Sequence, residues 1–296
     1  MDVDTALFRE FALPLLNRLQ QLVEEGRRPA IGLNAPVGAG KSSLCRLLAG
    51  LAPRLGLRLA VASIDDFYLP WSARLRALEG NPFAVTRVPP GSHDAALLRG
   101  CLTDWRAGGE LRLPRFDKTL RDAEGDRCGE QVLQAEALVL EGWLIGCRPL
   151  GPALATVDLE ARMAEAGPRA LSAAERLWLP RWDRALRAYA PAWAQLDELW
   201  LLRPGRWTLP WRWRFQAEAR QRRAGAAALA PETLDRLVRA SLCSLPPELY
   251  QDPLAQVAAA VGVLDGRRRL VTLERRVTLE RRRDHSPASS SSLSIG

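Results

Sequence analysis

The chain has 296 residues, of which 47% are hydrophobic and 26% are charged, and its formal net charge is +8. This length and balance are typical of a globular protein and exclude disorder throughout the chain. Five of the eight net charges come from residues 266–296, so the basic excess lies at the end of the chain and does not indicate a nucleic-acid-binding domain.

Membrane-spanning and disulfide-bonded classes are disfavoured as well. No apolar run approaches the length of a membrane span, and the acidic N-terminus lacks the layout of a signal peptide. The five cysteines are odd in number and widely spaced, with no C-x-x-C pair, which favours reduced buried thiols over disulfides or a zinc site. We therefore expect a cytoplasmic protein.

The first predicted elements are a helix and a sheet. Residues 4–26 have the apolar spacing of an amphipathic helix, and we assign 1–28 to an N-terminal helix packed on the core. Four short apolar runs predict buried strands, and the stretches between them are typical of helices. Together they predict an α/β fold with a mainly parallel sheet and helices on both faces, so functional groups should gather at the carboxyl ends of the strands. The four runs are 29–36, 57–69, 137–146 and 196–204.

Three further segments interrupt or follow this pattern. Residues 80–130 are rich in Pro, Gly, Arg and Asp with weak periodicity, which predicts a long loop that binds a ligand or acts as a lid. Residues 211–223 predict a basic helix, and 262–274 predict a last strand or hairpin. The hexapeptide VTLERR occurs twice in succession from residue 271, and a Ser-rich end follows. We expect 266–296 to hold the last strand or hairpin and a basic disordered tail without a catalytic role.

A glycine-rich turn after the first strand carries the clearest chemical signal. In the string APVGAGKSS, Gly40, Lys41 and Ser42 complete the pattern G-x-x-x-x-G-K-[ST], and Gly38 adds a further glycine. Glycines let backbone N–H groups curl around phosphate oxygens, the lysine reaches the β- and γ-phosphates, and the hydroxyl binds Mg²⁺. A chance glycine-rich turn is the alternative, but the strand before it and the helix after it argue against that. Ala35 replaces the first glycine, which weakens only the first turn if its φ is negative.

The rarity of lysine marks two positions. Among 42 basic residues only Lys41 and Lys118 are lysines, and all the others are arginines. A GC-rich coding bias would explain the arginines, but it would not explain why two lysines persist. A compact ammonium differs chemically from a planar guanidinium, so we expect both lysines to be functional.

Carboxylates end two of the predicted strands. The string SIDDFYL places Asp65 and Asp66 after the second strand, where one carboxylate could cap a helix and one could act as a base or metal ligand. The string ALVLEGW ends the third strand on Glu141, where a carboxylate beside a phosphate loop usually supports Mg²⁺. The alternative for Glu141 is an ordinary surface glutamate at the end of a strand.

The segment 80–130 carries further polar candidates. His93 lies in the string RVPPGSHD, and a lone histidine is more often structural than catalytic. The strings LPRFDK and GDR interleave arginines and aspartates with Lys118. A solvated charge run is the alternative, and the persistence of that lysine argues against it.

Taken together, these strings resemble the D-glycerate 3-kinase family, within the P-loop kinases that also include uridine kinase, pantothenate kinase and phosphoribulokinase. The phosphate loop alone is shared by many NTPases, whereas the linked strings GSHD, RFDK with GDR, and EGW are more specific. The family also has alanine at the position of Ala35, so the resemblance implies a working loop. The matching strings are APVGAGKSS, SIDDFYL, RVPPGSHD, LPRFDKTLRDAEGDR, EGWLIGCRPL and WRFQAE, in the family's order over residues 31 to about 222.

The resemblance implies a P-loop NTPase fold of three α/β/α layers, with a kinase domain at 29–265 and a lid helix at 211–225. It also implies Mg·ATP-dependent phosphorylation of a hydroxyl on a small anionic acceptor, D-glycerate being the best match. Asp65 would be the catalytic base, Lys41 and Arg214 further catalytic residues, and Ser42 and Glu141 the Mg²⁺ ligands. ATP would contact Ala35, Pro36, Val37, Gly38, Ala39, Gly40, Lys41, Ser42, Ser43 and Arg222, and the acceptor would contact Arg87, His93, Arg115, Asp117, Lys118 and Arg127.

Two other functions stay open. One is a P-loop kinase for another acceptor, such as a nucleoside, a pantothenate-like compound or a sugar, although a segment rich in Arg, His and Lys suits an anionic acceptor better. The other is a nucleic-acid-binding NTPase, which the confinement of the excess charge to the tail disfavours. The expected partners are therefore ATP, Mg²⁺ and a small-molecule acceptor, with no membrane, and the sequence indicates no oligomeric state.

Overall fold

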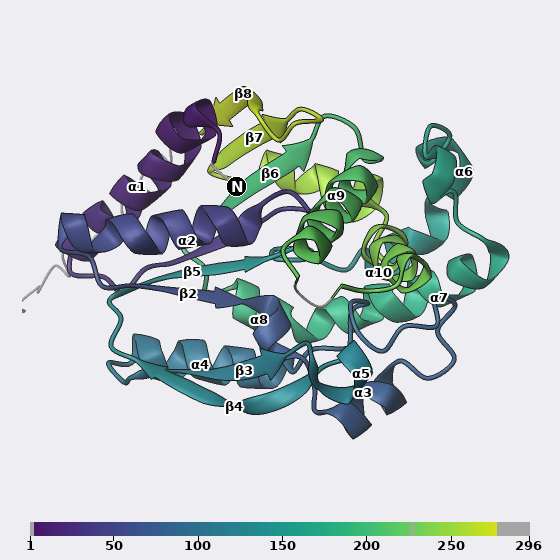
Figure 1. Ribbon diagram of the computed structural model, residues 1–296, viewed down its shortest axis with the longest axis horizontal. Coiled ribbons are helices and arrows are strands. Elements are labelled where there is room, and N and C mark those ends of the chain that lie inside the picture. Colours follow the sequence, from purple (N-terminus) through teal and green to yellow (C-terminus); the bar gives the residue numbers. More distant parts are fainter. Residues whose placement is uncertain (1–2, 226–227, 277–296) are drawn as a thin grey trace, which may run out of the picture.

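The computed structural model describes residues 3–225 and 228–276, and Figure 1 shows their arrangement around one main sheet. The sheet has six strands in the order β2-β5-β1-β6-β7-β8, in which neighbours run parallel except for the antiparallel pair β7–β8. Strands β3 and β4 form a separate antiparallel hairpin. The strands are β1 (Ala30–Asn34), β2 (Leu59–Ser63), β3 (Leu111–Asp117), β4 (Asp126–Leu133), β5 (Ala137–Gly142), β6 (Glu198–Pro204), β7 (Ala260–Leu264) and β8 (Leu270–Arg275).

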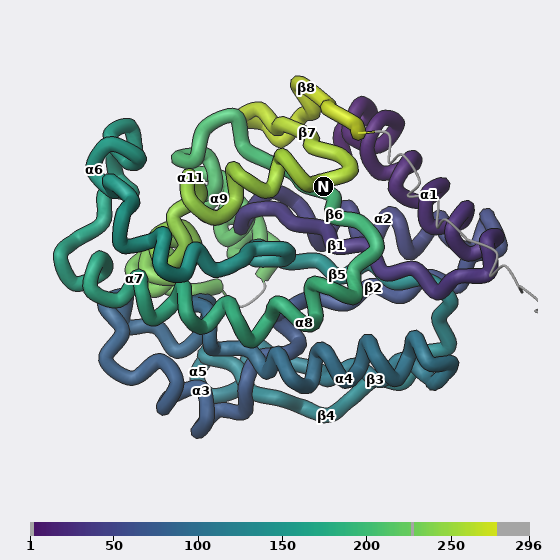
Figure 2. The backbone as a smooth tube through the Cα atoms, turned by 180° about the vertical axis from the view of Figure 1, so that it is seen from behind, coloured from purple at the N-terminus to yellow at the C-terminus, as the bar shows by residue number. Residues whose placement is uncertain are grey.

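Helices cover both faces of this sheet. Helices α1 and α2 pack on one face, and α4, α7 and α8 pack on the other, as the front and back views show (Figures 1 and 2). A π-helical turn η1 (Leu7–Ala12) leads into α1. The α-helices are α1 (Leu13–Glu24), α2 (Lys41–Leu51), α3 (Trp71–Ala77), α4 (Ala95–Arg106), α5 (Leu120–Ala123), α6 (Leu159–Arg162), α7 (Ala173–Ala185), α8 (Ala190–Trp193), α9 (Leu209–Arg223), α10 (Pro231–Cys243) and α11 (Pro247–Tyr250).

The alternation of side chains along the central strands divides the core in two. In β5, Val139 joins the cluster beneath α1 and α2, whereas Leu138 and Leu140 join the cluster against α4 and α8. Successive side chains of a strand point to opposite faces, so a strand covered on both faces must be apolar throughout. Strands β1 and β5 are buried along their whole length. The predicted α/β fold with a mainly parallel sheet between two helical layers is therefore confirmed.

The expectation of a long loop at 80–130 is wrong. That stretch contains α4, the β3–β4 hairpin and the short α5. Its weak periodicity has a physical reason, because most of β4 is exposed and an exposed hairpin needs no alternating apolar pattern. In α4 only one stripe faces the core, through Leu98, Leu102 and Trp105. The irregular part of the segment is the shorter connection between α3 and α4.

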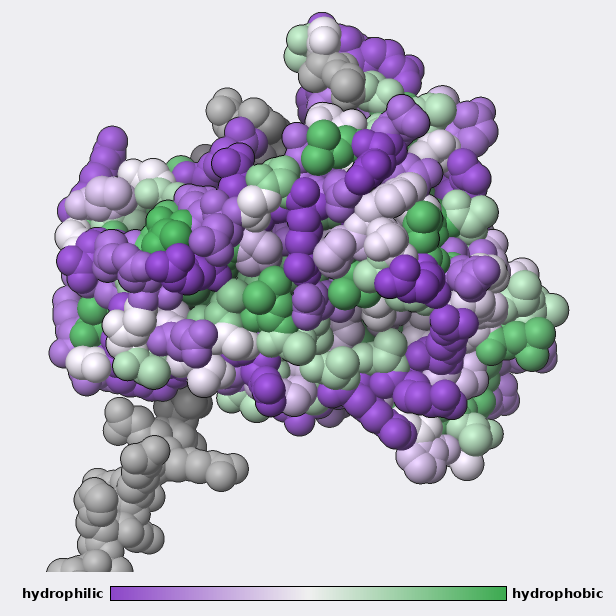
Figure 3. Space-filling view, turned by 90° about the horizontal axis from the view of Figure 1, so that it is seen from below, coloured by the Kyte–Doolittle hydropathy of each residue, from purple (hydrophilic) through white to green (hydrophobic). Residues whose placement is uncertain are grey.

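The surface of the described residues is mixed in polarity. On the face that Figure 3 shows, apolar side chains form small separate spots among polar ones. The most exposed large apolar residues are Leu177, Val257 and Val271, which lie on different elements. Scattered residues of this kind are normal on a globular protein. No helix within the described ranges is both long and apolar enough to cross a membrane.

The last strand decides where the chain can be shortened. Arg275 pairs with Ala260 across the β7–β8 hairpin, and the N–H of Arg276 donates to the carbonyl oxygen of Ala259. The stretch 277–296, for which the sequence predicts a disordered tail, lies outside the described residues.

We expect a chain ending at Arg276 to keep any catalytic activity within about twofold of the full chain, because the cut leaves every paired strand of the described residues intact. Any weak, salt-sensitive affinity for nucleic acid should fall with the lost arginines. Steady-state kinetics and a salt titration of nucleic-acid binding measure both effects. Loss of soluble expression on truncation would contradict this and would place 277–296 in the fold.

Candidate active site

An open cleft of about 670 Å³ lies at the carboxyl edge of the sheet. The glycine-rich loop after β1, the turn after β2, the end of β5, the turn after β3 and helix α9 all contribute to its walls. Carboxyl ends of parallel strands meet at one edge of a sheet, which is why residues far apart in the sequence converge here. Of the residues predicted from the sequence, the cleft is lined by Val37, Gly38, Gly40, Lys41, Ser42, Ser43, Asp65, Arg87, Lys118, Glu141 and Arg214.

The glycine-rich loop curls around the Lys41 side chain. Gly38 and Gly40 have φ values of +75° and +97°, which residues with a Cβ rarely adopt. The Nζ of Lys41 donates to the carbonyl oxygens of Ala35 at 2.8 Å and Pro36 at 3.1 Å. Helix α2 begins at Lys41 directly after Gly40, so its first N–H groups lie at the loop, where a helix N-terminus favours an anion.

Ala35 takes the place of the first glycine of the pattern without strain. It is not among the described residues with a positive φ, so a Cβ is tolerated there. Its side chain is fully buried, and its N–H donates to the carbonyl oxygen of Gly142 at 3.1 Å, which ties the start of the loop to the end of β5. The condition that the sequence set for a working loop is therefore met.

The two adjacent aspartates after β2 have different surroundings. Strand β2 ends at Ser63, earlier than the apolar run predicted, and residues 64–67 form a 3-10 turn. Asp66 closes a capping box, because its Oδ2 accepts from the N–H of Ser63 while the Ser63 hydroxyl accepts from the N–H of Asp65. The carboxylate of Asp65 takes no part in this cap and instead pairs with Lys118, although both aspartates line the cleft.

Glu141 and Lys41 form a buried electrostatic couple. The parallel register places Glu141 beside Ser63 of β2 and Leu33 of β1, and only 7% of Glu141 is exposed. Burial raises the pKa of the Glu141 carboxyl, and the positive charge of Lys41 opposes this rise. Burial likewise lowers the pKa of Lys41, and the negative charges of Glu141 and Asp65 oppose that change. Each group thus favours the charged form of the other.

Lys118 forms an ion pair with Asp65 across the cleft. The Nζ of Lys118 lies 2.6 Å from Oδ2 of Asp65, and the two side chains are 56% and 28% exposed. Burial alone would raise the pKa of Asp65, but the charge and hydrogen bond of Lys118 more than offset it, with smaller help from His93 and Lys41. The pKa of Asp65 therefore lies below its usual range, and the carboxylate is ionised at neutral pH.

Asp117 shapes the turn that carries Lys118. Its Oδ1 accepts from the N–H of Thr119 at 2.8 Å and from the Thr119 hydroxyl at 2.6 Å, and these bonds lower the pKa of the Asp117 carboxyl. Such a bond from a side chain to the backbone two residues on is an Asx turn. Asp117 does not line the cleft. In this structure its contacts orient Lys118 toward Asp65.

His93 lies behind the cleft, stacked on Tyr68. Their ring centroids are 4.4 Å apart, and backbone pairing between these two residues fixes the stack. The Tyr189 hydroxyl accepts from the N–H of Gly91 at 3.1 Å and lies 2.9 Å from Nδ1 of His93. Its proton is thus available for Nδ1, which leaves the ring proton on Nε2. Burial lowers the pKa of His93 to about 4, so the ring is neutral at pH 7.

The three arginines predicted for the acceptor take different positions. Arg87 is 7% exposed, lines the cleft and donates to the carbonyl oxygen of Ala123 at 2.8 Å. Arg127 does not line the cleft and instead holds the Tyr68 carbonyl oxygen and the carboxylate of Asp94, which caps α4. Arg115 is exposed and also lies outside the cleft.

Helix α9 supplies one wall of the cleft. Arg214 lies on this wall, in an ion pair with Glu218 at 2.7 Å. Arg222 was predicted to contact the nucleotide, but it is exposed outside the cleft and donates to the carbonyl oxygen of Leu229. Arg220, which the sequence analysis did not single out, lines the cleft in its place.

The cleft suits Mg²⁺ bound together with phosphate. Mg²⁺ in proteins is commonly held by one or two carboxylates or hydroxyls, with phosphate and water oxygens completing its octahedron. The Ser42 hydroxyl and the carboxylates of Glu141 and Asp65 all line the cleft. Within the described residues no group of three or more His, Cys, Asp or Glu side chains could hold an ion by itself. The donor set therefore fits an ion that arrives with a nucleotide.

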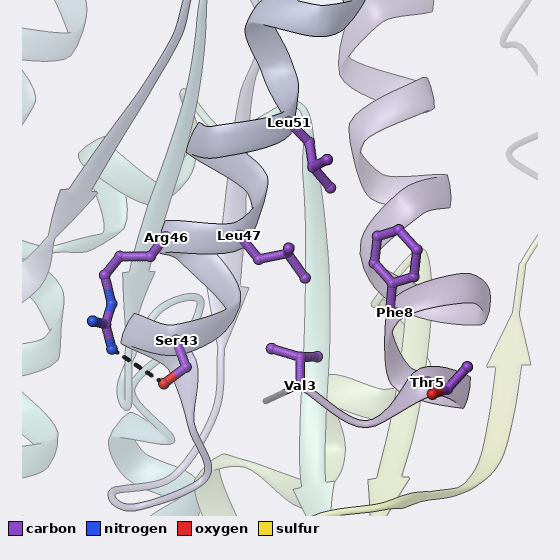
Figure 4. Close-up of a pocket in the computed structure, with 7 residues that line it drawn as sticks. All are labelled: Val3, Thr5, Phe8, Ser43, Arg46, Leu47 and Leu51. Atoms are coloured by element: carbon purple, nitrogen blue, oxygen red, sulfur yellow. Dashed lines mark hydrogen bonds between the residues drawn. The ribbon is translucent and has the colours of Figure 1, made fainter. Parts of the chain in front are cut away.

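A second hollow adjoins the phosphate end of the cleft. Figure 4 shows this groove of about 490 Å³ between the N-terminal segment and α2, with Leu47 and Leu51 on one side and Phe8 on the other. Ser43 and Arg46 line both the groove and the cleft, so the two are continuous at the start of α2. Four of its seven lining residues are apolar, Val3, Phe8, Leu47 and Leu51.

Comparison with known proteins places this geometry among kinases. No family model matches the chain. The chain is 28% identical over 206 residues to an uncharacterised kinase of Schizosaccharomyces pombe, spanning 66% of this chain and 71% of that protein. It is also 28% identical over 222 residues to the chloroplastic D-glycerate 3-kinase of Arabidopsis thaliana, spanning 70% of this chain but only 45% of the Arabidopsis protein.

A solved structure decides the matter. The D-glycerate 3-kinase of Cryptococcus neoformans superimposes with a TM-score of 0.73 at 28% identity, over 90% of this chain and 96% of that one. The chain is therefore similar to D-glycerate 3-kinases in both sequence and fold. The resemblance and the P-loop kinase fold predicted from the sequence are thereby confirmed.

Several residues of the site gave no usable sequence signal. Arg46 and Arg220 are hidden among the many arginines of the chain, and Ser63 precedes the aspartates that drew attention. Arg74 is fully buried and donates to the carbonyl oxygens of Leu69, Thr86, Glu124 and Gly125, which holds the segments around Tyr68 and Arg87 together. Only the three-dimensional contacts distinguish the buried Arg74 from the exposed arginines, and only they show that Arg46 and Arg220 line the cleft.

The Lys118–Asp65 pair makes a prediction for the pH dependence of turnover. In Lys118→Met the burial of Asp65 remains while its counter-charge is lost, so the pKa of Asp65 rises. A carboxylate that must be ionised then loses activity at a higher pH, and the acid limb of the kcat profile should move upward. Lys118→Arg keeps the charge and should leave this limb near its parental position while raising the acceptor KM. Superimposable profiles for Lys118→Met and the parent would show that the pair does not control the titration.

Proposed function

We propose that the protein transfers the γ-phosphoryl group of Mg·ATP to a hydroxyl of D-glycerate. The observation that carries the proposal is the meeting of two lysine–carboxylate couples in one cleft, Lys41 with Glu141 and Lys118 with Asp65. The first couple belongs to the phosphate loop and the second lies opposite it. A kinase needs these two positions, one for the phosphates and one for the attacking hydroxyl. The similarity to the Arabidopsis and Cryptococcus D-glycerate 3-kinases supports the choice of acceptor.

In this proposal the phosphate loop holds the triphosphate. The N–H groups at the start of α2 and the ammonium of Lys41 would bind the β- and γ-phosphates, and Arg214 and Arg220 would cover them from α9. Ser42 and Glu141 would hold the Mg²⁺ ion, whose charge neutralises the phosphate oxygens. The apolar groove beside Ser43 offers a surface for the nucleotide base. Phosphoryl transfer needs little covalent help, so this positioning supplies most of the catalysis.

Asp65 would orient the acceptor hydroxyl and take its proton. Its carboxylate stands at the end of β2, next to the phosphate loop, and is ionised because of Lys118. A carboxylate with a pKa below the usual range is a weak base. In a loose transition state, however, the acceptor hydroxyl loses its proton late, after its oxygen has begun to bond to phosphorus. An anionic acceptor also gives Lys118 a second partner. If the acceptor binds the ammonium of Lys118, the ion pair between Lys118 and Asp65 weakens. The pKa of Asp65 then rises, and its carboxylate becomes a stronger base.

The acceptor carboxylate would lie among Lys118, Arg87 and His93. Arginine and lysine bind carboxylates through charge-assisted hydrogen bonds. The Nε2 of His93 is buried behind the cleft and has no hydrogen-bond partner among the described residues, so it would donate to the acceptor only if ligand binding moved the ring toward the cleft. Asp117 and Arg127 support this pocket in the proposal through their hydrogen bonds, and Arg115 contributes only its positive charge near Asp117. The free cysteines of the described chain support a reducing compartment such as the cytoplasm.

The role of Asp65 gives a sharp test within the SIDD turn. Asp65→Asn keeps the shape of the side chain but cannot accept a proton, so kcat should fall at least about 10²-fold while Mg·ATP affinity changes little. Asp66→Asn is the matched control, because its side-chain oxygen can still accept from the N–H of Ser63, so stability and turnover should both stay within a small factor of the parent. Kinetics, one nucleotide titration and thermal unfolding separate the two. Equal, mild losses in both variants would remove Asp65 as the base, and loss of ATP affinity in Asp65→Asn alone would make it a metal ligand.

A panel of acceptors tests the substrate. With Mg·ATP and a coupled assay for ADP, D-glycerate should be phosphorylated with a kcat/KM at least about 10²-fold above that of glycerol, which lacks the carboxylate. Uridine, pantothenate and sugars serve as the other acceptors, and Asp65→Asn as the inactive control. Preference for an uncharged acceptor would contradict the proposed pocket while leaving the kinase chemistry in place.

A further inference from the structure

The turn between β7 and β8 contains three consecutive arginines, of which only the middle one is buried. Arg268 is 8% exposed, whereas Arg267 and Arg269 are exposed on either side of it. Its backbone has a φ of +64°, a conformation that costs a residue with a Cβ free energy and persists only where the surroundings hold it. This turn lies beyond residue 222, outside the strings that resemble the kinase family.

The guanidinium of Arg268 joins the phosphate loop to helix α9. Its Nε donates to the carbonyl oxygen of Gly38 at 2.7 Å, and its Nη2 donates to the carbonyl oxygen of Trp213, also at 2.7 Å. Its Nη1 lies 3.2 Å from Oε1 of Gln216, and its Cζ lies 5.6 Å from the centroid of the Trp213 ring. The indole of Trp213 in turn donates to the carbonyl oxygen of Gly266 in the same turn. One side chain thus ties together three segments that are distant in the sequence.

The loop and α9 pack so closely that there is no space for a side chain at Gly38. A Cβ on Gly38 would lie 2.7 Å from the backbone nitrogen of Arg214 and 2.9 Å from the carbonyl carbon of Trp213. The loop backbone and the α9 backbone are therefore in direct contact at Arg214, whose side chain lines the cleft. Because the peptide group is planar, fixing the Gly38 carbonyl also fixes the plane that it shares with Ala39. The position of Arg214 over the loop depends on the same contact.

The burial of the charged guanidinium of Arg268 is electrostatically unfavourable. Its hydrogen-bond acceptors are two backbone carbonyls and one side-chain amide, none of which carries a negative charge. Burial lowers the pKa of Arg268 to about 10, and the positive charges of Arg220 and Arg212 add to the shift. Only a planar fork with several N–H groups can reach all three acceptors at once, and a lysine has a single nitrogen.

We propose that Arg268 is a positioning residue for phosphoryl transfer, which sets the distance and orientation of α9, and hence of Arg214, relative to the phosphate loop. This inference rests on the proposed nucleotide site. It predicts an effect on the nucleotide half of the reaction, because the acceptor-side residues Lys118 and His93 have no contact with the turn.

The test is Arg268→Lys, with Arg267→Lys and Arg269→Lys as matched controls in the same turn. In Arg268→Lys we expect kcat/KM for Mg·ATP to fall about 10- to 100-fold, the size of effect that follows from a small displacement of a catalytic group. The acceptor KM should stay within about twofold, because its pocket is untouched. Both control variants should retain parental values. Gln216→Ala removes one acceptor only, and it should change kcat/KM for Mg·ATP in the same direction by a factor of about two to five.

A binding titration separates this inference from the proposed function. If the parent protein neither binds Mg·ADP nor turns over, the proposed nucleotide site fails. If the parent is active and a folded Arg268→Lys behaves like Arg269→Lys, only the role of Arg268 is overturned. An equal rise in the KM of both substrates would also overturn it, since that indicates general loosening. Should Arg268→Lys not fold, parental kinetics in Gln216→Ala would overturn the proposal and the expected loss would support it.

Discussion

The candidate site depends on the parallel pairing of β1, β2 and β5, which brings three strand ends to one level. The register sets Asn34 beside Gly142 and Ser63 beside Glu141, so the glycine-rich loop, the SIDD turn and the glutamate all begin where their strands stop. Were β5 shifted by one residue, Glu141 would point to the opposite face of the sheet. The complete burial of β1 and β5 under helices on both faces is what fixes this register.

Within that frame the charges of the cleft are arranged in couples. Removing Glu141 from water is unfavourable by itself, and so is removing Lys41, but each lies in the field of the other. Asp65 and Lys118 form a second couple, more exposed and therefore easier to open when a ligand enters. This difference in burial suits the two halves of the proposed reaction. The phosphate loop must be ready before the nucleotide arrives, whereas the acceptor has to displace something in order to bind.

The sequence predicted the parts of this site that a local pattern can encode. The glycines of the loop are recognisable because left-handed φ values require them, and Asp65 and Glu141 because they end apolar strands. The sequence does not predict the position of a side chain where that position depends on contacts with distant segments. The exposed β4 has no alternating pattern, so the sequence predicts a loop at 80–130 where the structure has α4 and the β3–β4 hairpin. Arg222 and Arg220 are two residues apart on one helix, and only the contact of α9 with the phosphate loop decides which of them faces the cleft.

The two rare lysines both lie in the cleft, whereas the rarity of lysine gives no information about the arginines. Both Lys41 and Lys118 line the cleft, where a compact ammonium can approach a carbonyl or a carboxylate as a point donor. Arg74 and Arg268, by contrast, connect backbone segments through several hydrogen bonds each. Arg74 ties together the segments of the acceptor side through four carbonyl oxygens, and Arg268 ties the phosphate loop to α9 through two carbonyls and an amide. A coding bias can explain why arginine is abundant, but a buried guanidinium surrounded by uncharged acceptors persists only if its geometry is needed.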